Sequence, residues 1–147
     1  MNSYHLIPGF PASMSPGSHA AEAEGFVFLT GQFGRDIDNP DAALPEGIAA
    51  QTEQTMRNMT RTLNALGLEL SDVLSVRVFL THFERDYDQM NTAYRAFFSD
   101  GSRPSRTCVG VTALVRSALV EIDCVAHRSS RAQRRPLDEG GQAVESR

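Results

Sequence analysis

Residues 106–121 read RTCVGVTALVRSALVE, and this stretch decides the expected fold. Two runs rich in β-branched residues, Arg106–Ala113 and Ala118–Ala126, flank a short turn at Leu114–Ser117. Such runs on either side of a short turn predict an antiparallel hairpin, in which the numbers of paired residues sum to about 231. The rest of the chain then has to supply the strands and helices that pack against this hairpin.

The register of the hairpin groups four side chains. Period-two alternation puts on one face Arg106, Cys108, Gly110 and Glu121, with the glycine opposite the glutamate. A glycine opposite a glutamate leaves a space the size of a side chain, in which a small carboxylate ligand would meet the arginine. The alternative is a surface cross-strand ion pair, which contributes only about 0.2 to 1 kcal/mol and implies no site. Both interpretations stay open on spacing alone.

Four further elements are expected upstream of the hairpin. They are a buried strand over Phe26–Leu29 that ends at Gly31, a helix over Glu46–Leu66 stopped by Gly67, a strand over Val73–Leu80, and a helix from Asp86 to about Asp100–Gly101. This order predicts an α+β domain with a mixed sheet and two helices packed on one face. The other face also needs a cover, and a second copy of the chain is the simplest one, so an oligomer is expected.

The composition bounds the classes of function. A chain of 147 residues with 41% hydrophobic residues can bury one core, and its net charge of −4 gives no basic surface for nucleic acid. No apolar run has the length of a membrane helix, and Met1–Phe10 lacks a secretory pattern, so we expect a cytoplasmic protein with no membrane partner.

Two further absences limit the chemistry. All 14 basic residues are arginines, so a Schiff base through lysine is excluded, including the usual attachment of pyridoxal phosphate. Cys108 and Cys124 lack the spacing of a zinc site or of a disulfide framework and are expected to be reduced thiols. A metal is not implied.

The chain is expected to divide into three parts. Residues 1–15 form an irregular N-terminal segment, residues 16–128 form the domain, and residues 129–147 form a disordered tail. The tail carries more arginines than acids, and a basic tail can touch RNA or an acidic partner, although solvated disorder is the expectation here.

Five blocks of the sequence, in order, carry a resemblance to a known family. They are Phe26–Gln32, Gln51–Thr55 with Asn58, Asn91–Phe98, Pro104–Cys108 and Val120–Ile122. Together they resemble the RidA (YjgF) family, and the Pro-x-Arg-x-Cys block is specific as a pair with Val-Glu-Ile. The resemblance implies a chorismate-mutase-like fold in a homotrimer, with the sheets forming a central barrel and three sites in the clefts between subunits.

The resemblance also implies an activity that needs no cofactor. This activity is the hydrolysis of reactive enamines and imines, such as 2-aminoacrylate, to a 2-keto acid and ammonia. Arg106 would hold the substrate carboxylate through two parallel hydrogen bonds, and Glu121 would activate the water or move protons, a role that favours a raised pKa. The pocket would be lined by Thr30, Gly31, Asn91 and Cys108, the last through its backbone carbonyl more than its thiol.

Gly17 departs from the family pattern, because many relatives carry a tyrosine at this position near the site. The smaller residue leaves room for a larger imine, such as a 2-aminomuconate-like one, and His19 is either a substitute polar group or a structural residue. A second hypothesis is a non-catalytic trimer that binds a 2-keto acid in the same cleft. A third, ribonuclease activity, is disfavoured by the acidic body and the lack of a histidine pair.

Overall fold

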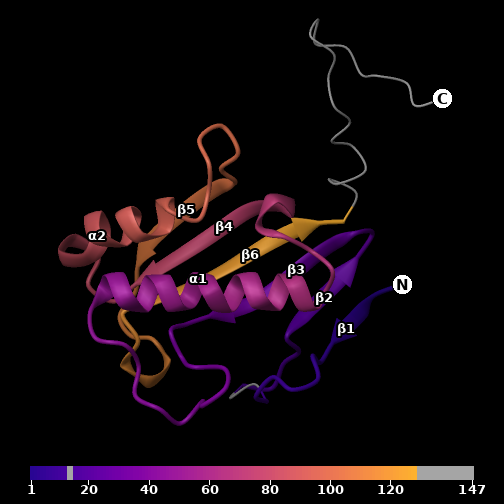
Figure 1. Cartoon of the computed structure of the whole chain (residues 1–147), viewed down its shortest axis with the longest axis horizontal. Coiled ribbons are helices and arrows are strands. Elements are labelled where there is room, and N and C mark those ends of the chain that lie inside the picture. The colour runs from indigo at the N-terminus through magenta and orange to yellow at the C-terminus, as the bar shows by residue number, and fades with distance from the viewer. Residues whose placement is uncertain (13–14, 129–147) are drawn as a thin grey trace, which may run out of the picture.

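A computed structural model describes residues 1–12 and 15–128 of the chain. Within them, one sheet has the strand order β1-β2-β3-β6-β4-β5 (Figure 1). The elements are β1 (Ser3–His5), β2 (Ala20–Ala23), β3 (Phe26–Gln32), α1 (Ile48–Ala65), β4 (Val73–Leu80), α2 (Phe83–Arg95), β5 (Ser105–Gly110) and β6 (Val120–His127), with 3₁₀ turns at Leu70–Asp72 and Val115–Ser117. Only the pairing of β4 with β5 is parallel among these strands, so the predicted mixed sheet is confirmed. The tail at 129–147, expected to be disordered, lies outside the described residues.

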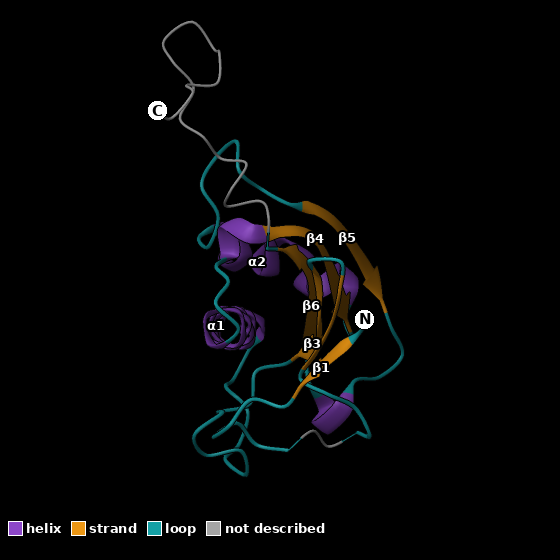
Figure 2. Cartoon of the chain, turned by 90° about the vertical axis from the view of Figure 1, so that its right-hand side faces the viewer, coloured by secondary structure: helices purple, strands orange, loops and turns teal. Residues whose placement is uncertain are grey.

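Both helices pack on the same face of the sheet, as predicted (Figure 2). Helix α1 buries its apolar stripe because Met56, Met59 and Leu63 recur at helical spacing, and all three are fully buried. The helix ends in a Schellman arrangement, in which the Leu68 amide donates to the Leu63 carbonyl at 2.9 Å and Gly67 adopts a φ of 76°. The predicted stop at Gly67 is confirmed.

Helix α2 begins at Phe83, before the predicted start at Asp86. Asp86 is not the N-cap but lies in the first turn, where a carboxylate interacts favourably with the positive end of the helix. The helix ends at Arg95, and Phe98 beyond its end still packs on Tyr94, with ring centroids 5.1 Å apart. Neither helix of the described part of the chain is long and apolar enough to cross a membrane.

The predicted hairpin is wrong in its pairing. Strands β5 and β6 run in opposite directions, but β4 lies between them and pairs with both. The connection, residues 111–119, is longer than predicted and wraps around the end of β4. The Val111 amide donates to the Leu80 carbonyl at 2.9 Å, and the Leu119 carbonyl accepts from the Thr81 amide at 3.2 Å. A connection of this length crosses two strand spacings, about 10 Å, whereas a tight hairpin turn joins only neighbouring strands.

This topology separates the side chains that the hairpin would have grouped. Arg106, Cys108 and Gly110 alternate onto the face that the helices cover, since each pairs with a buried residue of β4. Glu121 pairs with Phe79 on the opposite, uncovered face. The predicted shared face is therefore corrected: within one chain, the arginine and the glutamate lie on opposite sides of the sheet, and Gly110 is not opposite Glu121.

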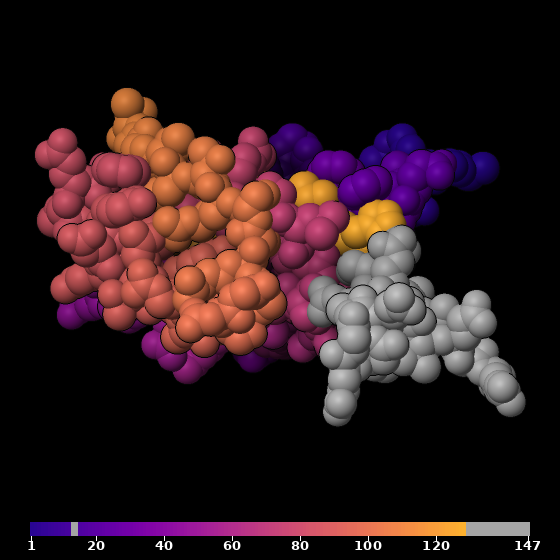
Figure 3. All heavy atoms as spheres, turned by 90° about the horizontal axis from the view of Figure 1, so that it is seen from above, coloured from indigo at the N-terminus to yellow at the C-terminus, as the bar shows by residue number. Residues whose placement is uncertain are grey.

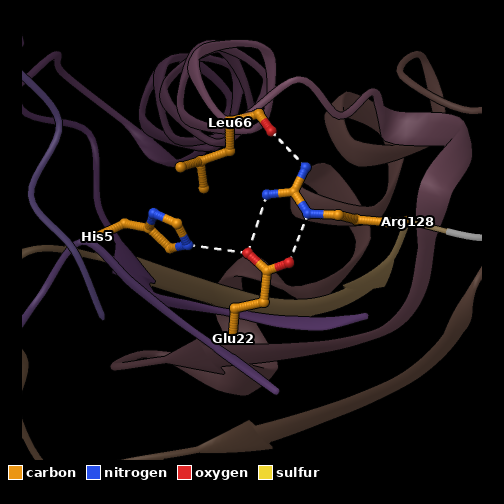
Figure 4. Close-up of polar contacts among 4 residues, drawn as sticks. All are labelled: His5, Glu22, Leu66 and Arg128. Carbon is orange, nitrogen blue, oxygen red and sulfur yellow. Dashed lines mark hydrogen bonds and ion pairs between the residues drawn. The ribbon is translucent and has the colours of Figure 1, made fainter. Parts of the chain in front are cut away.

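The N-terminal segment 1–15, expected to be irregular, contains strand β1, and the sequence did not predict β2 either. A polar cluster ties these strands to the rest of the domain (Figure 4). Glu22 on β2 accepts hydrogen bonds from His5 Nε2 at 2.9 Å and from Arg128 Nε at 2.6 Å. Arg128 also donates to the Leu66 carbonyl, just beyond α1, at 2.6 Å. The cluster joins β1, β2, α1 and the end of β6.

The second face of the sheet carries exposed apolar side chains. Phe28 is 50% exposed, Phe26 42% and Val109 41%, and the two phenylalanines alternate with the buried Val27 and Leu29. No helix of the described residues covers this face (Figure 2). In the space-filling view from above, the indigo N-terminal segment lies to the right of the orange segment that includes β5 (Figure 3). The exposed apolar side chains of the uncovered face lie on β3 and on the edge strand β5.

Candidate active site

Arg106 lies against helix α2, on the covered face of the edge strand β5. Its guanidinium donates to Asn91 Oδ1 at 2.7 Å and lies 4.8 Å from the centroid of the Tyr94 ring. A weaker contact, at 3.8 Å, runs to the Met90 sulfur. The amide and the aromatic face hold the guanidinium in one orientation. The predicted site residues Arg106 and Asn91 are therefore in direct contact.

The guanidinium of Arg106 borders a pocket of about 320 Å³, which we call the Arg106 pocket. Its lining residues are Tyr87, Asn91, Tyr94, Arg95, Arg103, Pro104 and Arg106. Arg103 is paired with Asp100, whereas Arg95 and Arg106 have no ion-pair partner within the described part of the chain. Three guanidiniums around one concave site favour an anion such as a carboxylate.

Glu121 stands on the uncovered face, against Gly31 of the neighbouring strand β3. A Cβ atom at Gly31 would lie 2.9 Å from Glu121 Oε2, so a larger residue there would displace the carboxylate. The glycine that faces Glu121, predicted to be Gly110, is thus Gly31. Burial, and then the negative charge of Asp123, raise the pKa of Glu121. A raised pKa is what a general base or acid working near neutral pH needs.

A pocket of about 410 Å³, which we call the Glu121 pocket, contains this carboxylate. Its lining residues are Ser15, His19, Thr30, Gly31, Gln32, Phe33, Arg35, Val115 and Glu121. Thr30 Oγ1 donates to the Ser18 carbonyl at 2.6 Å, which orients this side chain at the end of β3. The structure brings Thr30, Gly31 and Glu121 together in this pocket, and Arg106 with Asn91 in the other.

His19 has both ring nitrogens engaged in the N-terminal loop. Its Nδ1 accepts from the Ile7 amide at 2.7 Å, so Nε2 carries the proton and donates to the Pro11 carbonyl at 3.1 Å. The structural interpretation of His19 is therefore favoured. A Cβ at Gly17 would meet no heavy atom of the described residues within 4 Å, so the space that a tyrosine would occupy stays open.

Cys108 lies half-buried on the same face as Arg106. Burial raises the pKa of its thiol, and the nearby charge of Arg106 opposes this shift without reversing it. A thiol held in its neutral form is a poor nucleophile. Cys108 lines neither the Arg106 pocket nor any other pocket described for the single chain, so its predicted lining role stays a prediction. The described residues hold no group of three or more His, Cys, Asp or Glu side chains suited to a metal ion.

Three side chains at these pockets were missed by the sequence analysis. Tyr94 was not among the predicted site residues, yet its ring supports the guanidinium of Arg106, and its hydroxyl is buried with no hydrogen-bond partner in the described part of the chain. Phe33 and Arg35 follow β3 and line the Glu121 pocket. They lie outside regular structure, so no periodicity marks them, and only their closeness to Gly31 in the sequence was a signal.

Comparison with known proteins identifies the family of this chain. Residues 10–128 match the family model described as Endoribonuclease L-PSP. The chain is 34% identical over 120 residues to a RutC family protein of Aquifex aeolicus, covering 81% of this chain and 94% of that protein. It is 30% identical to the 2-iminobutanoate/2-iminopropanoate deaminase of Mus musculus, over 79% of this chain and 84% of that protein.

The solved structures agree with these relatives. The crystal structure of RidA from an Antarctic Psychrobacter matches with a TM-score of 0.75 and 31% identity, covering 84% of this chain and 97% of that one. The sequence matches, the six-stranded mixed sheet and the two helices on one face lead to one conclusion: the chain belongs to the RidA (YjgF) family.

Proposed function

We propose that the protein is an imine deaminase, which hydrolyses enamines and imines such as 2-aminoacrylate to a 2-keto acid and ammonia. The observation that carries this proposal is the orientation of the Arg106 guanidinium and its lack of a carboxylate partner. Its guanidinium is oriented by Asn91 and Tyr94, borders a basic pocket, and has no carboxylate partner among the described residues. Such a guanidinium favours bidentate binding of a substrate carboxylate. The deaminase names of several relatives support the same chemistry.

In this proposal the site is completed between the subunits of a homotrimer. Arg106 and Glu121 lie on opposite faces of the sheet, so one substrate contacts both only if two subunits each supply one of them. The uncovered face, with Phe28 and Val109 exposed, offers an apolar surface for this association. Three sheets facing one another would close into a central barrel.

Catalysis then depends mainly on the placement of the substrate and the attacking water. The enamine tautomerises to the imine, whose carbon is electrophilic, and Arg106 holds the adjacent carboxylate. Glu121 accepts a proton from water as the water oxygen bonds to the imine carbon. The proton passes to the nitrogen to give the carbinolamine. Glu121 then transfers the carbinolamine hydroxyl proton to the nitrogen as the carbon–nitrogen bond breaks, and the 2-keto acid and ammonia leave. Thr30, Gly31 and Cys108 shape the space around the reacting atoms.

Release of pyruvate from freshly generated 2-aminoacrylate tests this function. Arg106→Ala should lower kcat/KM by about 10- to 100-fold, because a hydrogen-bonded charge pair contributes roughly 1.5 to 3 kcal/mol. Arg57→Ala is the matched control, since Arg57 is exposed on α1 and, within the described residues, forms its ion pair with Glu53. Equal rates for Arg106→Ala and the wild type would sink the proposal. Binding of pyruvate without turnover would favour the non-catalytic trimer instead.

A further inference from the structure

Arg35 is a cation at the Glu121 pocket that the proposed hydrolysis does not use. It follows β3 and lines this pocket beside Phe33, whose ring centroid lies 5.7 Å from the guanidinium carbon. Asp41 lines an adjoining hollow, yet no carboxylate of the described residues forms an ion pair with Arg35. A half-buried guanidinium without a counter-ion is unfavourable unless an anion compensates its charge.

Arg116 brings a second positive charge to the same ring. Its guanidinium carbon lies 6.0 Å from the centroid of Phe33. Burial, and then the charge of Arg116, lower the pKa of Arg35 from its ordinary value. The two guanidiniums repel each other, so an anion bound beside them would be stabilised by both.

Arg116 already forms hydrogen bonds within the domain through its guanidinium. Its two amino groups donate to the Pro40 and Ala42 carbonyls at 2.7 and 2.8 Å, and its backbone adopts a left-handed φ of 54°. These bonds clamp the loop before α1 but leave the charge of Arg116 in place. The guanidinium of Arg35, by contrast, makes no hydrogen bond to any described residue. The N–H groups of Arg35 are therefore available to bind a ligand, and Arg116 strengthens the local positive potential.

We propose that the Glu121 pocket accepts substrates with a second carboxylate, bound at Arg35, so that the preferred substrates are imines of 2-amino diacids. This inference rests on the proposed function, in which Arg106 holds the carboxylate next to the imine carbon. The planar fork of Arg35 matches a carboxylate in two parallel hydrogen bonds. The pocket, of about 410 Å³, has space beyond what 2-iminopropanoate fills.

Binding of product analogues tests the inference without turnover. We would measure by calorimetry the affinities of 2-oxoglutarate and 2-oxoadipate, and those of 2-oxopentanoate and 2-oxohexanoate, which have the same chain lengths but no distal carboxylate. The wild type should bind the matching diacid about tenfold or more tightly than the monoacid of equal length. Arg35→Met should lose this preference and keep its monoacid affinity. Arg35→Lys should retain part of the preference, and Arg57→Met all of it.

Rates of hydrolysis distinguish the diacid preference from the deaminase function on which it rests. The imines of glutamate and norvaline, generated in place by an amino-acid oxidase, share five carbons and differ in the distal carboxylate. Hydrolysis of both at equal rates, with no effect of Arg35→Met, would overturn the diacid preference and leave the deaminase function intact. Hydrolysis of neither, with the diacid preference in binding retained, would overturn the deaminase function alone. An equal loss of affinity for diacids and monoacids in Arg35→Met would assign Arg35 to the fold and overturn the inference.

Discussion

Glu121 depends on its neighbours for the pKa that the proposed hydrolysis requires. Burial is the larger influence on its carboxyl group, and the negative charge of Asp123 acts in the same direction. Asp123 is itself paired with Arg77, whose Nε donates to it at 3.0 Å. Gly31 keeps the space in front of the carboxylate clear. The basicity of Glu121 is therefore set by strands β3, β4 and β6 together.

The charge of Asp123 is open to a direct test. If Glu121 is the base, the rate of imine hydrolysis should rise with pH along an acid limb that lies above the ordinary range of a glutamate. Asp123→Asn removes a neighbouring negative charge, which lowers the pKa of Glu121 and should move the acid limb of kcat/KM to lower pH. The control is Asp38→Asn, because the Asp38 carboxylate is exposed and pairs with Arg61. This substitution should leave the acid limb of kcat/KM unchanged. An acid limb unaffected by Asp123→Asn would argue against Glu121 as the titrating group.

The spatial relations between the site residues were only partly predictable from the sequence. Asp123 lies two positions from Glu121 on one strand, so their shared face follows from strand periodicity. The contact between Gly31 and Glu121 follows from the pairing of β3 with β6, which joins segments far apart in the chain. No local pattern encodes that pairing, and so the sequence assigned the facing glycine to Gly110.

At the scale of elements, one polar cluster connects the sheet edge to a helix. Glu22 on β2 bridges His5 on β1 and Arg128 at the end of β6, and Arg128 satisfies the Leu66 carbonyl at the C-terminal end of α1 (Figure 4). A cation near the end of a helix also interacts favourably with its dipole. The hydrogen bond to Arg128 is the main reason why the pKa of Glu22 falls from 4.5 to about 2.

This cluster predicts an acid-sensitive stability. Because the folded pKa of Glu22 is below its unfolded value, its contribution is complete above pH 4.5 and is lost as the pH falls towards 2. Glu22→Gln should cost about 1 to 2 kcal/mol at pH 7, less than the whole pKa shift implies, because Arg128 is 37% exposed and partly screened by solvent. Unfolding followed by circular dichroism across this pH range measures the difference from the wild type.

Two comparisons make that measurement specific. Glu53→Gln removes an exposed helical ion pair with Arg57 and should change stability by less than about 0.5 kcal/mol. The difference between Glu22→Gln and the wild type should shrink as the pH falls. If it stayed constant down to the acid transition, the cluster would not be the source of the pH dependence.

The bounds of most elements were predictable, because they depend on local patterns. The spacing of Met56, Met59 and Leu63 and the stop at Gly67 placed α1 to within a few residues. Strand β4 matches its prediction over Val73–Leu80. Strand β1 was missed because three residues at a sheet edge carry too short a pattern, and its pairing with β2 depends on a partner the local sequence does not specify.

At the scale of the whole molecule, the fold divides the proposed active site between two faces of one sheet. Arg106 lies on the face covered by the helices and Glu121 on the uncovered face. Neither pocket of a single chain contains both residues. The proposed trimer resolves this division, because a neighbouring subunit can bring its own Glu121 to the Arg106 pocket.

Mixed trimers test whether the site is shared. Arg106→Ala alone should keep about 1 to 10% of the wild-type activity, and Glu121→Gln alone should also be strongly impaired. Trimers assembled from equal amounts of the two variants should recover about one quarter of the wild-type rate, because random assembly gives that share of interfaces with both residues intact. The control is a homotrimer of the double variant, in which every chain carries both substitutions. It has no intact site and should stay inactive. Failure of the mixture to recover any activity, with trimers confirmed by light scattering, would contradict a shared site.

The sequence by itself determined the elements and the chemistry that this protein carries: the strand and helix segments, the family motifs, and the identities of Arg106, Glu121, Thr30, Gly31 and Asn91. These follow from local periodicity and from the side chains themselves. Only the tertiary structure decided the strand order, because backbone pairing in a sheet does not depend on which residues are adjacent in sequence. The insertion of β4 between β5 and β6 placed the arginine and the glutamate on opposite faces, and it left two pockets where the sequence had indicated one.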